Sequence, residues 1–153
     1  MLFRSGLKWD GVRRIDGWLS LYLGVEQSKV SCAFGARWLI SAVARIMQPG
    51  CKVDCSLILE GAQGIGKSRA LKTLAGEFFT DSMPDLHSKD AAVQLAGVWI
   101  VELAELDTLG RAESATIKAF MSRQTDRFRA PYAKRAEDAK RQCVFSGGCS
   151  FPI

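Results

Sequence analysis

The chain reads Gly61-Ala62-Gln63-Gly64-Ile65-Gly66-Lys67-Ser68 near its middle, and this stretch fits the signature G-x-x-x-x-G-K-[ST] at every fixed position. The apolar run Leu57-Ile58-Leu59 precedes it and predicts a buried strand. The residues after Lys67 predict a helix that ends near Gly76. A glycine-rich turn between a strand and a helix N-terminus presents backbone N–H groups to negatively charged oxygens. The stretch therefore indicates a phosphate-binding loop, with a chance glycine-rich turn as the weaker alternative.

Each residue type in this loop has a chemical role. The glycines let the backbone bend and approach phosphate oxygens closely. Lys67 can place its ammonium against the β- and γ-phosphates, and the small hydroxyl of Ser68 can bind Mg²⁺. We therefore predict ATP and Mg²⁺ as ligands, with the nucleotide bound by Gly61, Gln63, Gly64, Ile65, Gly66, Lys67, Ser68 and Arg69.

Such a site also needs a carboxylate at the end of another strand. A second apolar run, residues 98–101, is followed directly by Glu102, with Glu105 three residues further on. We predict Ser68 and Glu102 as the metal ligands, and Lys67, Glu102 and Glu105 as the catalytic residues. The spacing does not decide which glutamate serves the metal and which orients the attacking water, and Asp107 is a weaker competitor. Solvated carboxylates that cap a helix are the alternative.

The rest of the chain divides into two parts by its pattern. Helical periodicity predicts helices over residues 13–23 and 28–47, so that residues 1–50 form an N-terminal helical segment. Residues 51–153 form the nucleotide-binding core, with helices near 90–95 and 111–122 and a third strand at 143–145. Strands that alternate with helices predict an α/β fold with a largely parallel sheet.

Composition excludes several other classes of protein. The chain is 48% hydrophobic with a net charge of +5, which suits a globular protein with phosphate-rich partners. We find no apolar run of about 18 residues and no secretory signal, and we expect a cytoplasmic protein without a membrane partner. The five cysteines form no C-x-x-C pair and there is one histidine, so no zinc site is expected.

Several segments together resemble the virulence-associated protein E family, P-loop proteins of phages, plasmids and genomic islands that are related to superfamily 3 helicases. The most specific part of the likeness is the combination of Glu102 and Glu105 with the later Lys118, Asp126 and Arg129. The segments that carry the resemblance are residues 9–19, 59–68, 99–106, 117–120 and 122–132.

This resemblance implies a fold and partners. The fold is the three-layer α/β sandwich of P-loop NTPases such as AAA+ and superfamily 3 helicase domains, here incomplete. The function is that of an ATPase domain in a DNA replication helicase-like protein of a mobile element, which forms homo-oligomeric rings in complete relatives. A solvated loop fits the basic segment equally well, but by resemblance its DNA contacts, to single or double strands, are Lys118, Arg127, Arg129 and Lys134.

The chain departs from the family pattern after its third predicted strand. The family has a polar sensor there, usually Thr-Asn, and then an arginine that acts at a subunit interface. This chain reads Phe145-Ser-Gly-Gly-Cys-Ser-Phe-Pro-Ile153, with Ser150 near the asparagine position. We therefore expect a copy truncated at the C-terminus that retains ATP binding through its intact loop. We do not expect efficient hydrolysis, because an arginine finger contributes ~10³–10⁵ in rate. The alternative function is a non-hydrolysing nucleotide-binding or interaction module; a P-loop kinase has less support.

Overall fold

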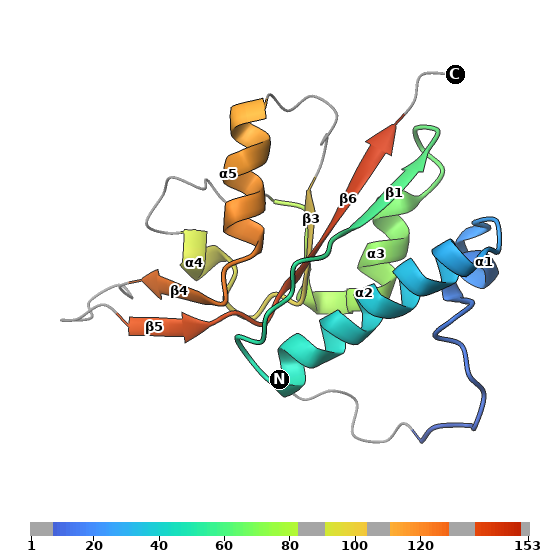
Figure 1. Ribbon diagram of the computed structural model, residues 1–153, viewed down its shortest axis with the longest axis horizontal. Coiled ribbons are helices and arrows are strands. Elements are labelled where there is room, and N and C mark those ends of the chain that lie inside the picture. The colour runs from blue at the N-terminus through green and yellow to red at the C-terminus, as the bar shows by residue number, and fades with distance from the viewer. Residues whose placement is uncertain (1–7, 83–90, 104–110, 129–136, 151–153) are drawn as a thin grey trace.

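A computed structural model describes residues 8–82, 91–103, 111–128 and 137–150 of the chain (Figure 1). The helices are α1 (Trp18–Leu23), α2 (Lys29–Met47), α3 (Lys67–Ala75), α4 (Ala91–Gln94) and α5 (Arg111–Met121), with a short 3₁₀ helix at Gly76–Phe78. The strands are β1 (Leu57–Gly61), β2 (Phe79–Thr80), β3 (Ile100–Leu103), β4 (Thr125–Phe128), β5 (Glu137–Lys140) and β6 (Val144–Ser150).

Four of these strands form one parallel sheet in the order β1-β6-β3-β2. This confirms the predicted α/β fold with a parallel sheet. The last strand in the chain, β6, lies between β1 and β3, where Ser146 is opposite Leu57 on one side and Glu102 on the other. All four strands therefore end at the same edge, and the loop after β1 is at this edge together with the end of β3.

Helices cover both faces of the sheet, because neighbouring strand residues point to opposite sides. On one face Leu57, Leu59, Ile100 and Val144 pack with residues of α1, α2 and α3. On the other face Val101, Leu103 and Phe145 pack with Ile117 and Phe120 of α5 and with α4. Figure 1 shows this division, with α5 and α4 on one side and α2 and α3 on the other.

Helix α2 is the part of the N-terminal helical segment that is hydrogen-bonded to the core of the sheet. It occupies Lys29–Met47, close to the predicted range of 28–47, and is capped by Ser28, whose Oγ accepts the Ser31 N–H at 3.0 Å while the Ser31 Oγ accepts the Ser28 N–H at 2.9 Å. Trp38 donates from Nε1 to the Phe145 carbonyl of β6 at 2.8 Å, and Trp99 donates from Nε1 to the Ala42 carbonyl at 2.9 Å. Trp38 and Trp99 are both buried, so these two hydrogen bonds anchor α2 to the core.

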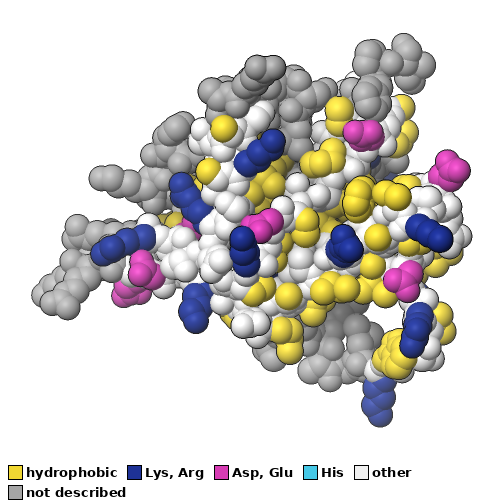
Figure 2. Space-filling model, in the orientation of Figure 1, with side chains coloured by type: hydrophobic (Ala, Val, Ile, Leu, Met, Phe, Trp, Pro, Cys, Tyr) yellow, Lys and Arg dark blue, Asp and Glu magenta, His cyan; other side chains and the backbone are white. Residues whose placement is uncertain are grey.

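The outer side of α2 is apolar. Phe34, Ile40, Val43 and Met47 are each more than half exposed, and Figure 2 shows hydrophobic side chains gathered over the half of the molecule that contains α1, α2 and β1. By length and composition alone, α2 could cross a membrane, with a mean hydropathy of 1.3. The sequence analysis missed this because arginines interrupt the apolar run; the core helices of many soluble proteins meet the same criterion.

Helix α1 is shorter than predicted. The periodic pattern extends over residues 13–23, but the helix begins only at Trp18. Upstream, an Asp10 carboxylate oxygen accepts the Val12 N–H at 3.0 Å, and the same side chain pairs with Arg14 at 2.6 Å. This local turn competes with the helix, and Gly17 provides no side-chain cap.

Two elements had no signal in the sequence. β2 has only two residues, and β4 and β5 form an antiparallel hairpin of mostly charged residues without apolar alternation. The hairpin is anchored by a buried ion pair at its base, in which Arg141 Nε donates to Asp126 Oδ2 at 2.7 Å and the Arg141 guanidinium also binds Oδ1 and the Phe120 carbonyl. Asp126 is thus paired with Arg141 inside the fold, and the sequence alone does not reveal this pairing.

We expect Trp38→Phe to lower the free energy of unfolding by about 2–3 kcal/mol, because it removes a buried hydrogen bond and leaves a void beside β6. Trp9→Phe is the matched control, since Trp9 is 76% exposed, and it should change stability little. Urea denaturation followed by circular dichroism measures both, and equal losses would contradict the role assigned to Trp38.

Asp126→Asn should destabilise the fold by about 3 kcal/mol, because it leaves the buried Arg141 guanidinium without its counter-charge. Asp138→Asn makes the same chemical change on the same hairpin, where the side chain is 66% exposed. The Asp138 variant should stay within about 0.5 kcal/mol of the parent. If both variants unfold at the same urea concentration, the ion pair does not hold the hairpin.

Candidate phosphate-binding site

The predicted loop lies between the end of β1 at Gly61 and the start of α3 at Lys67. Gly64 and Gly66 have φ values of 81° and 94°, in the left-handed region that favours glycine. At Gly61, a Cβ atom would lie 2.6 Å from Cδ1 of Ile65, so the end of the exposed Ile65 side chain would have to move. The path of the backbone therefore favours glycine at Gly64 and Gly66.

The N-terminus of α3 has no side-chain cap. Gly66 is the capping residue and makes no side-chain hydrogen bond to the helix. The first N–H groups of a helix have no partner inside the helix, and together with the helix dipole they attract an anion. The N-terminus of α3 thus presents the N–H groups and the partial positive charge that bind a phosphate group.

Lys67 lies back over its own loop. Its Nζ donates to the Gly61 carbonyl at 2.7 Å and to the Ala62 carbonyl at 3.0 Å. The ammonium is half-buried and is held directly beside the glycine-rich turn. An anion seated on the loop would lie within reach of this ammonium.

Ser68 and Glu102 are brought together from α3 and β3. Ser68 Oγ donates to Glu102 Oε1 at 2.7 Å. Glu102 is 4% exposed, and its second oxygen, Oε2, is buried without a hydrogen-bond partner among the residues that the structure describes. Gly148 of β6 lies beside them: a Cβ on Gly148 would be 3.6 Å from Lys67 Cε and 3.8 Å from Glu102 Oε1.

These residues fit a magnesium ion. Mg²⁺ prefers oxygen ligands and usually binds through one or two protein groups plus phosphates and water. Ser68 Oγ and Glu102 supply two neighbouring oxygen donors, one of them an unpaired carboxylate oxygen. Among the described residues no group of three or more His, Cys, Asp or Glu could hold a metal ion.

The structure describes some of the remaining predicted site residues and not others. Gln63 and Ile65 are exposed on the loop, and Arg69 is exposed in the first turn of α3. Glu105 and its competitor Asp107 lie outside the described residues, as do Arg129 and Lys134.

A groove of about 840 Å³ continues from the loop toward α1. One wall is formed by the loop and α3, including Ile65 and Arg69. The other is formed by Trp18, Tyr22, Leu23 and Val25. The sequence analysis did not predict this second wall, because α1 is about 40 residues away from the loop in the chain and its aromatic residues have the spacing of a core helix.

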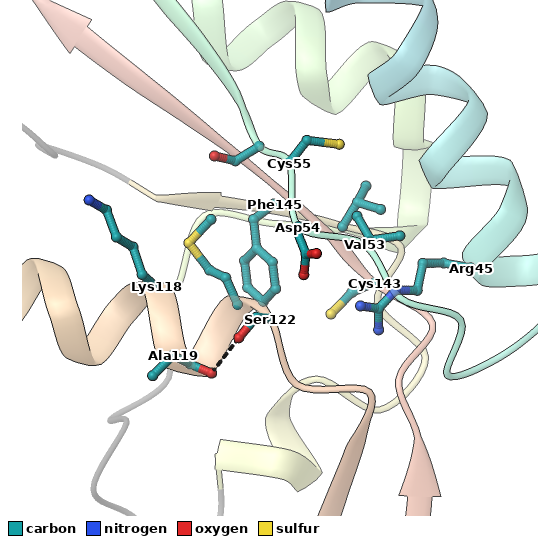
Figure 3. A pocket seen from close by; sticks show the side chains of 12 residues that line it. Arg45, Val53, Asp54, Cys55, Lys118, Ala119, Ser122, Cys143 and Phe145 are labelled. Atoms are coloured by element: carbon teal, nitrogen blue, oxygen red, sulfur yellow. Dashed lines mark hydrogen bonds between the residues drawn. The ribbon is translucent and has the colours of Figure 1, made fainter.

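A separate cavity of about 520 Å³ lies on the α5 face of the sheet (Figure 3). Lys118 extends from α5 on one side, and Arg45 and Cys143 lie together on the other. Burial lowers the pKa of Arg45 and raises the pKa of the Cys143 thiol to about 11. At neutral pH the thiol is therefore protonated and a poor nucleophile, and the cavity has no residue in common with the phosphate loop.

The two DNA-contact predictions that can be located lie away from the loop. Lys118 is exposed on α5, and Arg127 is on β4 with a side chain that is 76% exposed and 3.9 Å from Asp138. The β4–β5 hairpin projects from the body of the molecule (Figure 1). The structure thus separates these basic residues from the predicted phosphate site.

Comparison with known structures supports the fold. Two structures of the apo C-terminal region of NrS-1 match with a TM-score of 0.56 each, at 22% and 21% identity, and cover 82% and 86% of this chain. The chain spans 30% and 32% of those chains, or about a third of their length. At this level of identity the likeness concerns the fold alone.

Comparison of the sequence identifies the family. No curated protein matches this chain. The model of the virulence-associated protein E-like domain matches residues 4–150, which is nearly the whole chain. The glycine-rich loop, the parallel sheet and this match together place the chain in the virulence-associated protein E-like domain family.

Proposed function

We propose that this chain is an ATP-binding P-loop domain of a helicase-like protein that acts in replication of mobile-element DNA. The observation that carries the proposal is the contact between Ser68 and Glu102 at the uncapped start of α3. A strand, a glycine-rich loop and a helix N-terminus give the phosphate cradle, and a second strand brings a buried carboxylate with one unpaired oxygen to it. The family and the fold support a role in DNA replication. We include the P-loop NTPase fold in the same proposal.

The roles of the residues follow from their positions. The N–H groups at the start of α3 bind phosphate oxygens, and Lys67 exchanges its two carbonyl partners for the β- and γ-phosphates. Ser68 and Glu102 hold Mg²⁺, which when bound neutralises charge on those phosphates. Glu102 or Glu105 orients the attacking water in an in-line displacement.

A second function, nucleotide binding without turnover, has one observation in its favour. The residue of β6 that faces Lys67 and Glu102 is Gly148, which carries no side chain. The family resemblance implies a polar sensor with Ser150 near its asparagine position, so this chain has no amide side chain at either residue. A site without that group binds the nucleotide but stabilises the transition state less.

Lys67→Ala should weaken ATP binding by about 100-fold, because it removes the positive charge beside the phosphates. Lys72→Ala removes a charge from the same helix at an exposed position in its last turn and should leave the affinity unchanged. Isothermal titration calorimetry in Mg²⁺ measures both. Equal ATP affinity for the parent and the Lys67 variant would refute the phosphate site.

Phosphate release separates the two functions. Steady release that rises with single-stranded DNA and disappears in Glu102→Gln supports an ATPase. ATP binding without release by the parent supports the non-hydrolysing module.

We also propose that the β4–β5 hairpin contacts nucleic acid through Arg127, with Lys118 as a second basic contact on α5. Arg127→Ala should weaken binding of single-stranded DNA a few-fold and reduce the salt dependence of log K by about 0.7, the value for one phosphate contact. Asp138→Asn should act in the opposite direction, because Asp138 lies 3.9 Å from Arg127 and competes with phosphate.

Fluorescence anisotropy over a range of salt concentrations measures these effects. Arg37→Ala is the control, since it removes the same charge from the exposed side of α2. If the Arg37 and Arg127 variants lose the same affinity, the effect is one of net charge and the hairpin is not the contact.

A further inference from the structure

The groove beside the phosphate loop is larger than a triphosphate tail requires. It has a volume of about 840 Å³ and includes Gly64, Gly66 and Lys67 at one end. From there it extends between the loop and α1. A ligand with its phosphates on the loop therefore has its remaining part directed into this groove.

The α1 wall of the groove is aromatic and apolar. The Tyr22 side chain is 61% exposed and Val25 is 38% exposed, and both line the groove. Ile65 on the loop is 64% exposed and lines the same groove. An exposed aromatic ring and an exposed apolar side chain in one groove provide surfaces that can stack on a nucleobase.

The position of this wall is fixed by buried packing. Trp18, one turn before Tyr22, is 8% exposed, and its ring is stacked on Trp38 of α2 with centroids 6.0 Å apart. The helix ends at Gly24, whose φ of 69° turns the chain so that the Val25 N–H donates to the Leu19 carbonyl at 3.3 Å. Tyr22 and Val25 are thus held in place while their outer surfaces stay open.

We propose that this groove is the nucleoside subsite: the base stacks on Tyr22 and is enclosed by Leu23 and Val25 on one side and by Ile65 and Arg69 on the other. The proposal rests on the function proposed above, because the phosphates must be on the loop. The continuity of the groove with Gly64, Gly66 and Lys67 is the reason for assigning it to a nucleoside. The chain would then recognise a nucleoside triphosphate as a whole, with α1 supplying contacts that the loop signature does not contain.

The test compares ATP with inorganic tripolyphosphate, both with Mg²⁺, by isothermal titration calorimetry on the whole chain. Tripolyphosphate carries the phosphate chain without base or ribose. If the groove binds the nucleoside, the parent binds ATP about tenfold more tightly than tripolyphosphate, the effect typical of one stacked base. This comparison needs no variant, so it does not depend on a substitution that disturbs folding.

Variants then assign the effect to α1. Tyr22→Ala should bring the affinity for ATP down to that for tripolyphosphate and leave tripolyphosphate binding unchanged, while Tyr22→Phe keeps the preference for ATP. Leu21→Ala is the matched control, because Leu21 is 68% exposed on the same helix but does not line the groove.

The outcomes separate the two proposals. If neither compound binds to the parent, the phosphate site itself fails. If both bind to the parent equally well, the loop is retained and the nucleoside subsite is overturned. If Tyr22→Ala leaves ATP affinity unchanged but lowers the mass found by light scattering, the groove is a contact between copies of the chain and the proposal is also overturned.

Discussion

The pairing of β6 between β1 and β3 is the constraint on which the site depends. β1 delivers the glycine-rich loop and β3 delivers Glu102, so the width of one intervening strand sets the distance between them. At Gly148 the intervening strand has no side chain, and a Cβ there would contact both Lys67 Cε, at 3.6 Å, and Glu102 Oε1, at 3.8 Å. Because parallel strands end at a common edge, the loop and the carboxylate meet there although they are far apart in the sequence.

Local signals explain what could be predicted. The glycine-rich loop, the helix over Lys29–Met47 and the end of α3 at Gly76 depend on a few neighbouring residues, and each lies where the sequence indicates. The position of Glu102 beside Ser68 followed from one more step, that acidic residues after a buried strand reach the edge where the loop lies. Boundaries were less accurate, since β3 begins at Ile100 although the apolar run begins at Val98.

Long-range contacts explain what could not be predicted. The β4–β5 hairpin has no apolar pattern, and it is held by the ion pair between Asp126 and Arg141, which are 15 residues apart. In the sequence alone, the basic and acidic residues of this hairpin are indistinguishable from a solvent-exposed charged segment. The position of Tyr22 in the groove could not be predicted either, because it depends on how α1 packs on α2 through Trp18 and Trp38.

The unpaired oxygen of Glu102 argues for a ligand rather than for a structural role. A buried carboxylate oxygen without a partner costs stability, because it has lost its water and gained no hydrogen bond. If Glu102 served only to hold Ser68, a glutamine would accept the same hydrogen bond through Oε1 without burying a charge. A cation at Oε2 removes that cost, so its binding is coupled to the stability of the fold. The proposed metal site therefore rests on the buried oxygen at Glu102 Oε2, and the residue beside it, Gly148, adds no side chain that would compete with a ligand there.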